Sequence, residues 1–283
     1  MSLTKPISRR GALVGIAVTA TGTMLPRALL AQDTPYLLPD TDVCSVMPEV
    51  TEGPYYLDDV LVRRDIREDR EGVPVLLRMQ VVDASCAPIP GARVDVWHCD
   101  AQGVYSSFGG GEAGQSSETG ETFLRGTQMA DDTGLVEFDT IYPGWYRGRT
   151  THIHYKVWLD ETNILTGQIF FPDALSEYLY DHAMPYLRDG TRDTVNSIDG
   201  IAQQASYAAF ADVKEQSDGY VVQLIVGVSP DAVSQDVGMP GGDRPSGPPP
   251  GGETAGGPPP DGGMGGPTGS RDGASLIPGA DEA

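Results

Sequence analysis

Short apolar runs rich in Val, Ile and aromatic residues recur through the middle of the chain. They cover residues 73–83, 92–100, 134–143, 151–160, 164–172 and 220–229. Gly, Pro and Asp are concentrated between them, as in APIPGA, DDTG and PGWYRGR. Strand-length runs separated by turn-forming residues are typical of antiparallel sandwiches and barrels. The pattern therefore predicts an all-β fold, an antiparallel β-sandwich.

Two stretches depart from this pattern of apolar runs and turns. Residues 173–215 contain short helix-compatible segments, which predict a minor helix at the periphery. Residues 106–126 hold too few apolar side chains to form an element, and a loop of that length in a compact domain is often functional. We expect a sandwich with long loops and a minor peripheral helix.

The first 31 residues have the composition of an export signal. Arg9 and Arg10 precede a small-residue apolar segment from Gly11 to Leu25, and residues 1–31 contain no acid. Paired arginines before such a segment are typical of a twin-arginine signal, and the segment is short for a membrane span, which needs about 20 apolar residues. We expect cleavage near Ala31 and export to the periplasm or the medium, with no membrane span after processing. An uncleaved anchor is the alternative.

From about residue 236 the sequence is dominated by Gly and Pro. Such a composition cannot bury enough apolar surface to offset its chain entropy, so residues 236–283 are predicted to be a disordered acidic tail. Residues 32–235 remain as one folded domain. The formal net charge is −21, and −25 without the four basic residues of the predicted signal. This charge argues against nucleic acid or an anionic membrane as a partner.

The chain has three cysteines, Cys44, Cys86 and Cys99. In an exported protein they allow one disulfide and leave one thiol over. Cys99 lies inside the apolar run 92–100, where a cysteine can serve as a small buried hydrophobe. We therefore favour a Cys44–Cys86 disulfide, with the other pairings left open.

Two of the four histidines, His152 and His154, lie two residues apart at the start of the run 151–160. Residues i and i+2 of a strand point to the same face, so the pair can converge on one metal ion. A solvent-facing or hydrogen-bonded pair is equally compatible with the spacing. We interpret His98 as a structural histidine and His182 as a surface residue.

Aromatic and basic residues precede the histidine pair, in IYPGWYRGR. A tyrosine has an ordinary pKa of about 10, and only a strong local cation makes it a phenolate at neutral pH. Ferric iron could act as that cation. On spacing alone, the commoner outcome is that Tyr142, Trp145 and Tyr146 form a loop cluster packed over the edge of the sandwich.

Four ordered motifs resemble one enzyme family. TEGPYY (51–56), VDVWHCDAQGVYS (94–106), DDTGLVEFDTIYPGWYRGRTTHIH (131–154) and GQIFF (167–171) together resemble the intradiol ring-cleavage dioxygenases, which include the protocatechuate and catechol dioxygenases. The resemblance implies that residues 32–235 are a catalytic domain. It also implies a non-haem Fe(III) cofactor, a catecholic small-molecule substrate, O2 as co-substrate and a muconate-type diacid as product.

The resemblance also implies roles for individual residues. The four iron ligands of the family fall on Tyr105, Tyr146, His152 and His154. Tyr146 is assigned as the ligand that the substrate displaces. The family arginine falls on Arg149, which would stabilise negative charge on the ring, and the family glutamine on Gln168, which would orient the arginine. Either tyrosine of the GPYY segment, Tyr55 or Tyr56, is a candidate wall of the substrate pocket.

Two departures from the family pattern concern the substrate. The loop 147–151 is shorter than in the catechol and protocatechuate enzymes, and the chain lacks room for the N-terminal helical linker of catechol dioxygenases. The sequence is thus similar to the protocatechuate type or to an exported branch. The choice of catechol and the oligomeric state stay open, a homo-oligomer included. The alternatives are a secreted ligand-binding module without metal, using loop 142–146 as its platform, and a zinc site performing hydrolysis.

Overall fold

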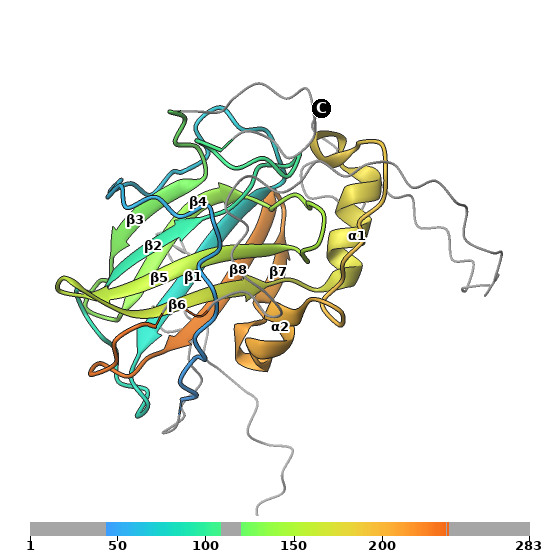
Figure 1. Cartoon of the computed structure of the whole chain (residues 1–283). Helices are drawn as coiled ribbons and strands as arrows, with labels where there is room; N and C mark the ends of the chain where they lie inside the picture. Colours follow the sequence, from blue (N-terminus) through green and yellow to red (C-terminus); the bar gives the residue numbers. More distant parts are fainter. Residues whose placement is uncertain (1–43, 109–119, 236, 238–283) are drawn as a thin grey trace, which may run out of the picture. The chain divides into compact units, whose positions relative to one another are not determined.

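The computed structural model describes residues 44–108, 120–235 and 237, which form two four-stranded sheets (Figure 1). The first sheet has the strand order β4-β1-β8-β7 and the second β3-β2-β5-β6. The strands are β1 (Pro74–Val82), β2 (Arg93–Trp97), β3 (Arg125–Met129), β4 (Leu135–Ile141), β5 (His152–Leu159), β6 (Thr162–Phe170), β7 (Asp212–Gln216) and β8 (Gly219–Gly227).

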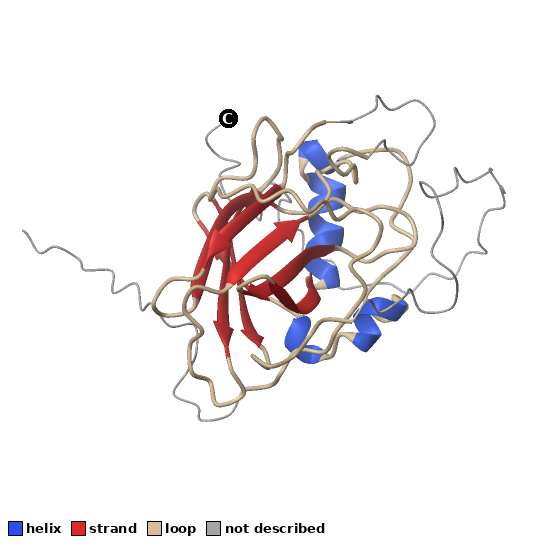
Figure 2. Ribbon diagram, turned by 60° about the vertical axis from the view of Figure 1, so that its left-hand side comes forward, coloured by secondary structure: helices blue, strands red, loops and turns tan. Residues whose placement is uncertain are grey.

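The helices are short and lie together at one side of the strands (Figure 2). They are α1 (Asp173–His182), α2 (Gly200–Gln204) and the 3-10 helices η1 (Met184–Tyr186) and η2 (Tyr207–Ala209). Among the residues that the structure describes, no helix is long and apolar enough to cross a membrane. The predicted signal 1–31 and, apart from residue 237, the predicted tail lie outside the described residues.

The predicted all-β sandwich with minor helices is confirmed, with two differences in detail. The β1–β8 pair is parallel, whereas the other named strand pairs are antiparallel. The sequence pattern also missed β3 and β7, which lie at sheet edges. The sequence of β7, DVKEQ, is largely exposed, and charged residues are common on edge strands because they oppose pairing with other chains.

The hydrophobic core lies between the two sheets, and β5 separates it from a polar face. Ile153, Tyr155 and Val157 point into the core and are fully buried. The alternate residues His152 and His154 point to the opposite, outer face of the second sheet, as the two-residue period of a strand requires. Both histidines are nevertheless buried, so another part of the chain must cover this face.

An N-terminal strap, defined here as residues 44–56, runs past β8 of the first sheet and β6 of the second, and its last part lies over the outer face of the second sheet, beside His154 and Gln168. Its backbone is fixed by Met47 N donating to Gly227 O (2.8 Å) and Val50 N donating to Thr166 O (3.0 Å). At its start, Cys44 forms a disulfide with Cys86, which confirms the favoured pairing. Cys99 is a buried free thiol, as expected. The strap is thus cross-linked to the turn after β1.

Candidate active site

The two histidines of β5 direct their rings toward one point. Their Nε2 atoms lie 3.0 Å apart. The His154 ring stacks on Trp97 of β2, with 4.9 Å between ring centroids, because Trp97 is its cross-strand partner. Strand register therefore sets the position of the pair.

Two tyrosines reach the same point from loops. Tyr105 lies in the loop after β2, and its Oη is 3.4 Å from His152 Nε2. Tyr146 lies in the loop after β4, and its Oη is 3.1 Å from the same nitrogen. The structure thus brings together all four predicted ligands, Tyr105, Tyr146, His152 and His154.

Hydrogen bonding defines the tautomer of His152. Its Nδ1 lies 2.6 Å from the carbonyl oxygen of Thr150, which can only accept, so Nδ1 carries the proton. The lone pair of the neutral imidazole is then on Nε2, facing the cluster. Burial and the nearby charge of Arg149 lower the pKa of His152 to about 3. Burial and the neighbouring His152 also hold the pKa of His154 well below its ordinary value, so both rings are neutral.

The donor set fits a metal ion. Ligand atoms about 2 Å from a common ion, at angles near 90–110°, are roughly 2.8–3.5 Å apart, and the distances around His152 Nε2 are 3.0–3.4 Å. Burial raises the pKa of Tyr105 and Tyr146 above the ordinary value. Only a cation between these hydroxyls would make them phenolates. The described residues contain no group of three or more His, Cys, Asp or Glu that could hold a metal. The cluster described above is of another kind, because two of its four members are tyrosines.

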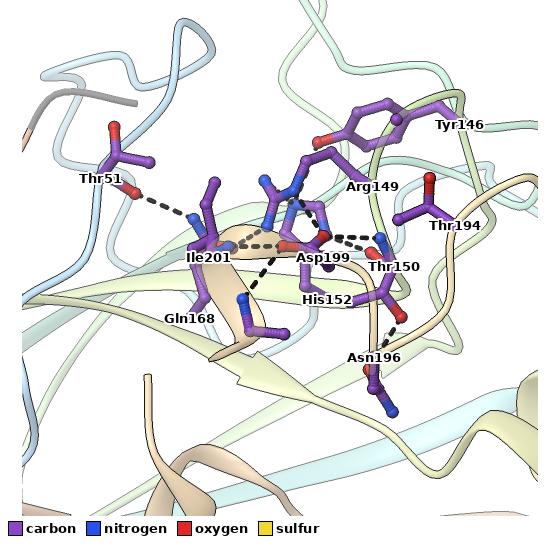
Figure 3. A network of polar contacts seen from close by, with 12 residues as sticks. Thr51, Tyr146, Arg149, Thr150, His152, Gln168, Thr194, Asn196, Asp199 and Ile201 are labelled. Carbon is purple, nitrogen blue, oxygen red and sulfur yellow. Dashed lines mark hydrogen bonds and ion pairs between the residues drawn. The ribbon is translucent and has the colours of Figure 1, made fainter. Parts of the chain in front are cut away.

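Arg149 and Gln168 lie beside the cluster (Figure 3). Arg149 Nη1 is 3.4 Å from His152 Nε2, and Arg149 Nη2 donates to Gln168 Oε1 at 2.5 Å. Gln168, opposite His154 on β6, donates through Nε2 to the carbonyl oxygen of Thr51 in the strap, 2.9 Å away. The guanidinium is buried and places a positive charge at the edge of the candidate metal site.

Asp199 completes this network, and the sequence analysis missed it. The residue is the N-cap of α2, and its Oδ2 also accepts from Arg149 Nε at 2.9 Å. Burial alone would raise the pKa of Asp199, but the charge of Arg149 and the N–H donors outweigh it and lower the pKa. The sequence DGIAQQ signals a helix start, yet nothing in it indicates a partner fifty residues earlier.

The GPYY tyrosines have different environments. Tyr55 stacks on Tyr105 with 4.2 Å between ring centroids, and its edge faces Tyr146. Tyr56 instead donates to Asp95 Oδ2 at 3.1 Å and packs on Trp97. Tyr55 is therefore the one that lies against Tyr105 and Tyr146.

The structure also shows the environments of the other residues that the sequence analysis considered. His98 is buried, with Nε2 2.7 Å from Thr140 Oγ1, which confirms its structural role, and His182 is exposed. Tyr142 is a core residue whose hydroxyl meets Ser176 Oγ at 2.8 Å. It therefore does not form one loop cluster with Tyr146. Residues 109–119 of the predicted long loop lie outside the described residues.

Fold and site together define a β-sandwich protein with a two-tyrosine, two-histidine site, and the comparisons with known proteins give its family. The family model described as Dioxygenase matches residues 50–191. An intradiol ring-cleavage dioxygenase structure from Tetranychus urticae is 33% identical, with a TM-score of 0.62, covering 68% of this chain and 98% of that one. The chain belongs to the intradiol ring-cleavage dioxygenase family.

Two sequence relatives are catechol 1,2-dioxygenases. The protein from Pseudomonas sp. (strain EST1001) is 31% identical over 157 residues, which are 47% of this chain and 49% of the relative. The protein from Acinetobacter baylyi is 27% identical over 215 residues, 66% of each chain. The chain thus spans about half to two thirds of the length of these curated relatives.

Proposed function

We propose that the protein cleaves the ring of a catechol between its two hydroxyl-bearing carbons, consuming O2 and giving a muconate-type diacid. The observation that carries this proposal is the convergence of two phenol oxygens and two neutral imidazoles: the hydroxyl oxygens of Tyr105 and Tyr146 and the Nε2 atom of His154 all lie 3.0–3.4 Å from His152 Nε2. Family membership supports the reaction class. Relatives named catechol, chlorocatechol and hydroxyquinol 1,2-dioxygenases support a catechol-type ring.

In this proposal Tyr105, Tyr146, His152 and His154 hold non-haem Fe(III). The bound ferric ion would supply a Lewis-acidic centre that binds the catechol oxygens and makes the ring reactive toward O2. Tyr105 is almost fully buried beneath Tyr55, whereas Tyr146 is partly exposed. Tyr146 is therefore the ligand that can move away when substrate arrives, and its Oη can take up a substrate proton.

Arg149 would act by electrostatics. Its guanidinium is fixed in place before the reaction, and a fixed positive charge stabilises negative charge that develops in a water-poor site. Arginine remains protonated at any working pH. Its Nη1 faces the ligand cluster, so Arg149 would stabilise charge on the ring, and Gln168 would orient it.

We further propose that the protein acts outside the cytoplasm. The twin-arginine sequence at Arg9 and Arg10 supports export, and so does the Cys44–Cys86 disulfide, because disulfides persist mainly in oxidising compartments. Cell fractionation of the unsubstituted chain and of an Arg9→Lys/Arg10→Lys variant tests this. The double variant should stay inside the cell; equal export of both would refute the assignment.

The visible spectrum of the iron-loaded protein tests the reaction. We expect about one iron per chain, a tyrosinate-to-iron charge-transfer band and a shift of that band when catechol is added without O2. Admitting O2 should then yield the diacid. Tyr105→Phe should abolish or weaken the band. The matched control is Tyr142→Phe, which removes a buried hydroxyl outside the cluster and should leave the band unchanged.

Other results would direct the assignment elsewhere. A folded protein that stays colourless with iron supplied would refute the ferric site. Stoichiometric zinc with hydrolytic activity, or ligand binding without any metal, would then support the two alternative functions.

A further inference from the structure

We propose that Asp199 is a second positioning residue of the site: together with Gln168, it holds the Arg149 guanidinium at the edge of the proposed metal centre. The inference rests on the proposed function, because Arg149 is taken to stabilise charge in that reaction. Asp199 comes from the N-terminus of α2 and Arg149 from the loop before β5, fifty residues apart in sequence. In Figure 3 the aspartate lies between the helix and that loop.

The two carboxylate oxygens of Asp199 have separate partners. Oδ1 accepts from the backbone N–H groups of Ile201 (2.8 Å) and Ala202 (3.0 Å) and caps α2. Oδ2 accepts from Arg149 Nε (2.9 Å) and from Thr150 N (2.8 Å). One oxygen therefore fixes the carboxylate to the helix, and the other fixes the loop between Tyr146 and His152.

The contacts of Arg149 explain why this matters for position. Nε is bound to Asp199, Nη2 is bound to Gln168, and Nη1 faces His152. Two of the three nitrogens are thus held, which leaves the third pointing at the cluster. Gln168 is neutral, and Asp199 is the only ion-pair partner of Arg149 among the described residues. A buried arginine without such a partner would be driven toward solvent, since an unpaired buried charge is costly.

Other contacts hold the loop without touching Arg149. Gly148 N donates to Asp193 Oδ1 at 3.0 Å, and Thr150 Oγ1 donates to Asn196 Oδ1 at 2.8 Å. The loop thus keeps two anchors when Oδ2 of Asp199 is removed. The Asp199–Thr150 contact therefore adds to these two anchors, whereas the Asp199–Arg149 contact sets the direction of the guanidinium.

Asp199→Asn separates the two roles. Asparagine is as good an N-cap as aspartate, so its oxygen can keep the helix contacts. Its amide nitrogen then replaces Oδ2 and faces two N–H donors. We expect kcat for catechol to fall about 10–100-fold, with KM changed much less. Iron content and the resting charge-transfer band should be retained, because no ligand is removed.

A double-mutant cycle distinguishes positioning from a general structural effect. If Asp199 acts through Arg149, then Asp199→Asn in an Arg149→Ala background lowers kcat no further. A purely structural role would multiply the two losses. A second cycle uses urea unfolding of the metal-free protein. There the folding equilibrium constant of the double variant should differ about tenfold from the value expected if the effects of the two single substitutions were independent.

Asp95→Asn is the matched control. Asp95 is also buried, accepts from Arg93 Nη2 at 2.9 Å and from Thr127 Oγ1 at 2.7 Å, and lies on the second sheet. Its substitution should lower stability while leaving kcat within about twofold, since no contact with Arg149 is lost.

The outcomes separate the inference from the function on which it rests. Unchanged kcat in Asp199→Asn, loss of its iron, or multiplicative effects in the kinetic cycle would overturn the positioning role. An unsubstituted protein that is colourless and inert would overturn the proposed function and the catalytic role of the contact. In that case the unfolding cycle still decides whether Asp199 holds Arg149, because additive effects there would refute the contact itself.

Discussion

The Cys44–Cys86 disulfide should contribute a large part of the stability of this domain. It closes a sequence separation of 42 residues and fixes the start of the strap, which covers the candidate site. In the chain-entropy relation, a loop of this length lowers the entropy of the unfolded chain by about 13 cal/mol/K, or about 4 kcal/mol at 25 °C. We therefore expect a Cys44→Ser/Cys86→Ser variant to unfold with a free energy about 4 kcal/mol lower.

The assay is equilibrium urea unfolding, followed by tryptophan fluorescence, with iron release into a chelator measured in parallel. Gly53 of the strap lies beside the His154 ring, since an added Cβ would be in ordinary contact with Cε1 at 3.4 Å, and the carbonyl oxygen of Thr51 accepts from Gln168. A strap released at one end should open more often, so iron should leave the variant faster. A reducing agent should destabilise the unsubstituted protein by the same amount and leave the variant unaffected. Equal unfolding midpoints and slopes for both proteins would refute the reasoning.

Three further predictions concern other parts of the molecule. Burial lowers the pKa of His98 to about 4, so the neutral imidazole contributes about 3 kcal/mol of stability that is fully present above an unfolded pKa of about 6.5 and is lost as pH falls toward 4. In urea unfolding, the free energy of unfolding of His98→Gln should therefore fall less steeply in acid than that of the unsubstituted protein, and identical pH slopes would contradict this. Gly167→Ala should lower the free energy of unfolding by about 1–3 kcal/mol in the same assay, because the added Cβ would overlap the Tyr155 ring. An unchanged urea midpoint would show that the ring can move. Tyr55→Ala should raise KM for catechol and perturb the visible band, while Tyr56→Phe should do neither; equal effects would show that both tyrosines line the site.

The period of the strands made much of the site predictable. His152 and His154 share a face because they are two residues apart in a strand, and the structure confirms that they converge. Tyr105 and Tyr146 could not be placed by period or spacing, because each lies in a loop that a different strand positions. Their assignment depended on the family resemblance. Loop residues of this kind are set by tertiary contacts, which local sequence patterns do not encode.

Asp199 shows a different limit of sequence reasoning. An aspartate before GIAQQ is a good N-cap, so the local pattern fully accounts for one carboxylate oxygen. The second oxygen accepts from Arg149 in the loop before β5, fifty residues earlier in the sequence, and only the three-dimensional structure reveals that contact. A residue with a sufficient local explanation is therefore easily excluded from a list of functional candidates.

The charges of the site explain how it can fold before any metal binds. The two imidazoles are neutral, burial keeps the two phenols protonated, and the charge of Arg149 is compensated by Asp199. No charge in this cluster is therefore buried without a partner, a state that would destabilise the fold strongly. A cation that enters must displace the phenol protons, so its binding couples to pH. The same aspartate that directs the arginine thus also makes the metal-free site stable, and for this reason its two effects have to be separated by the kinetic and unfolding cycles together.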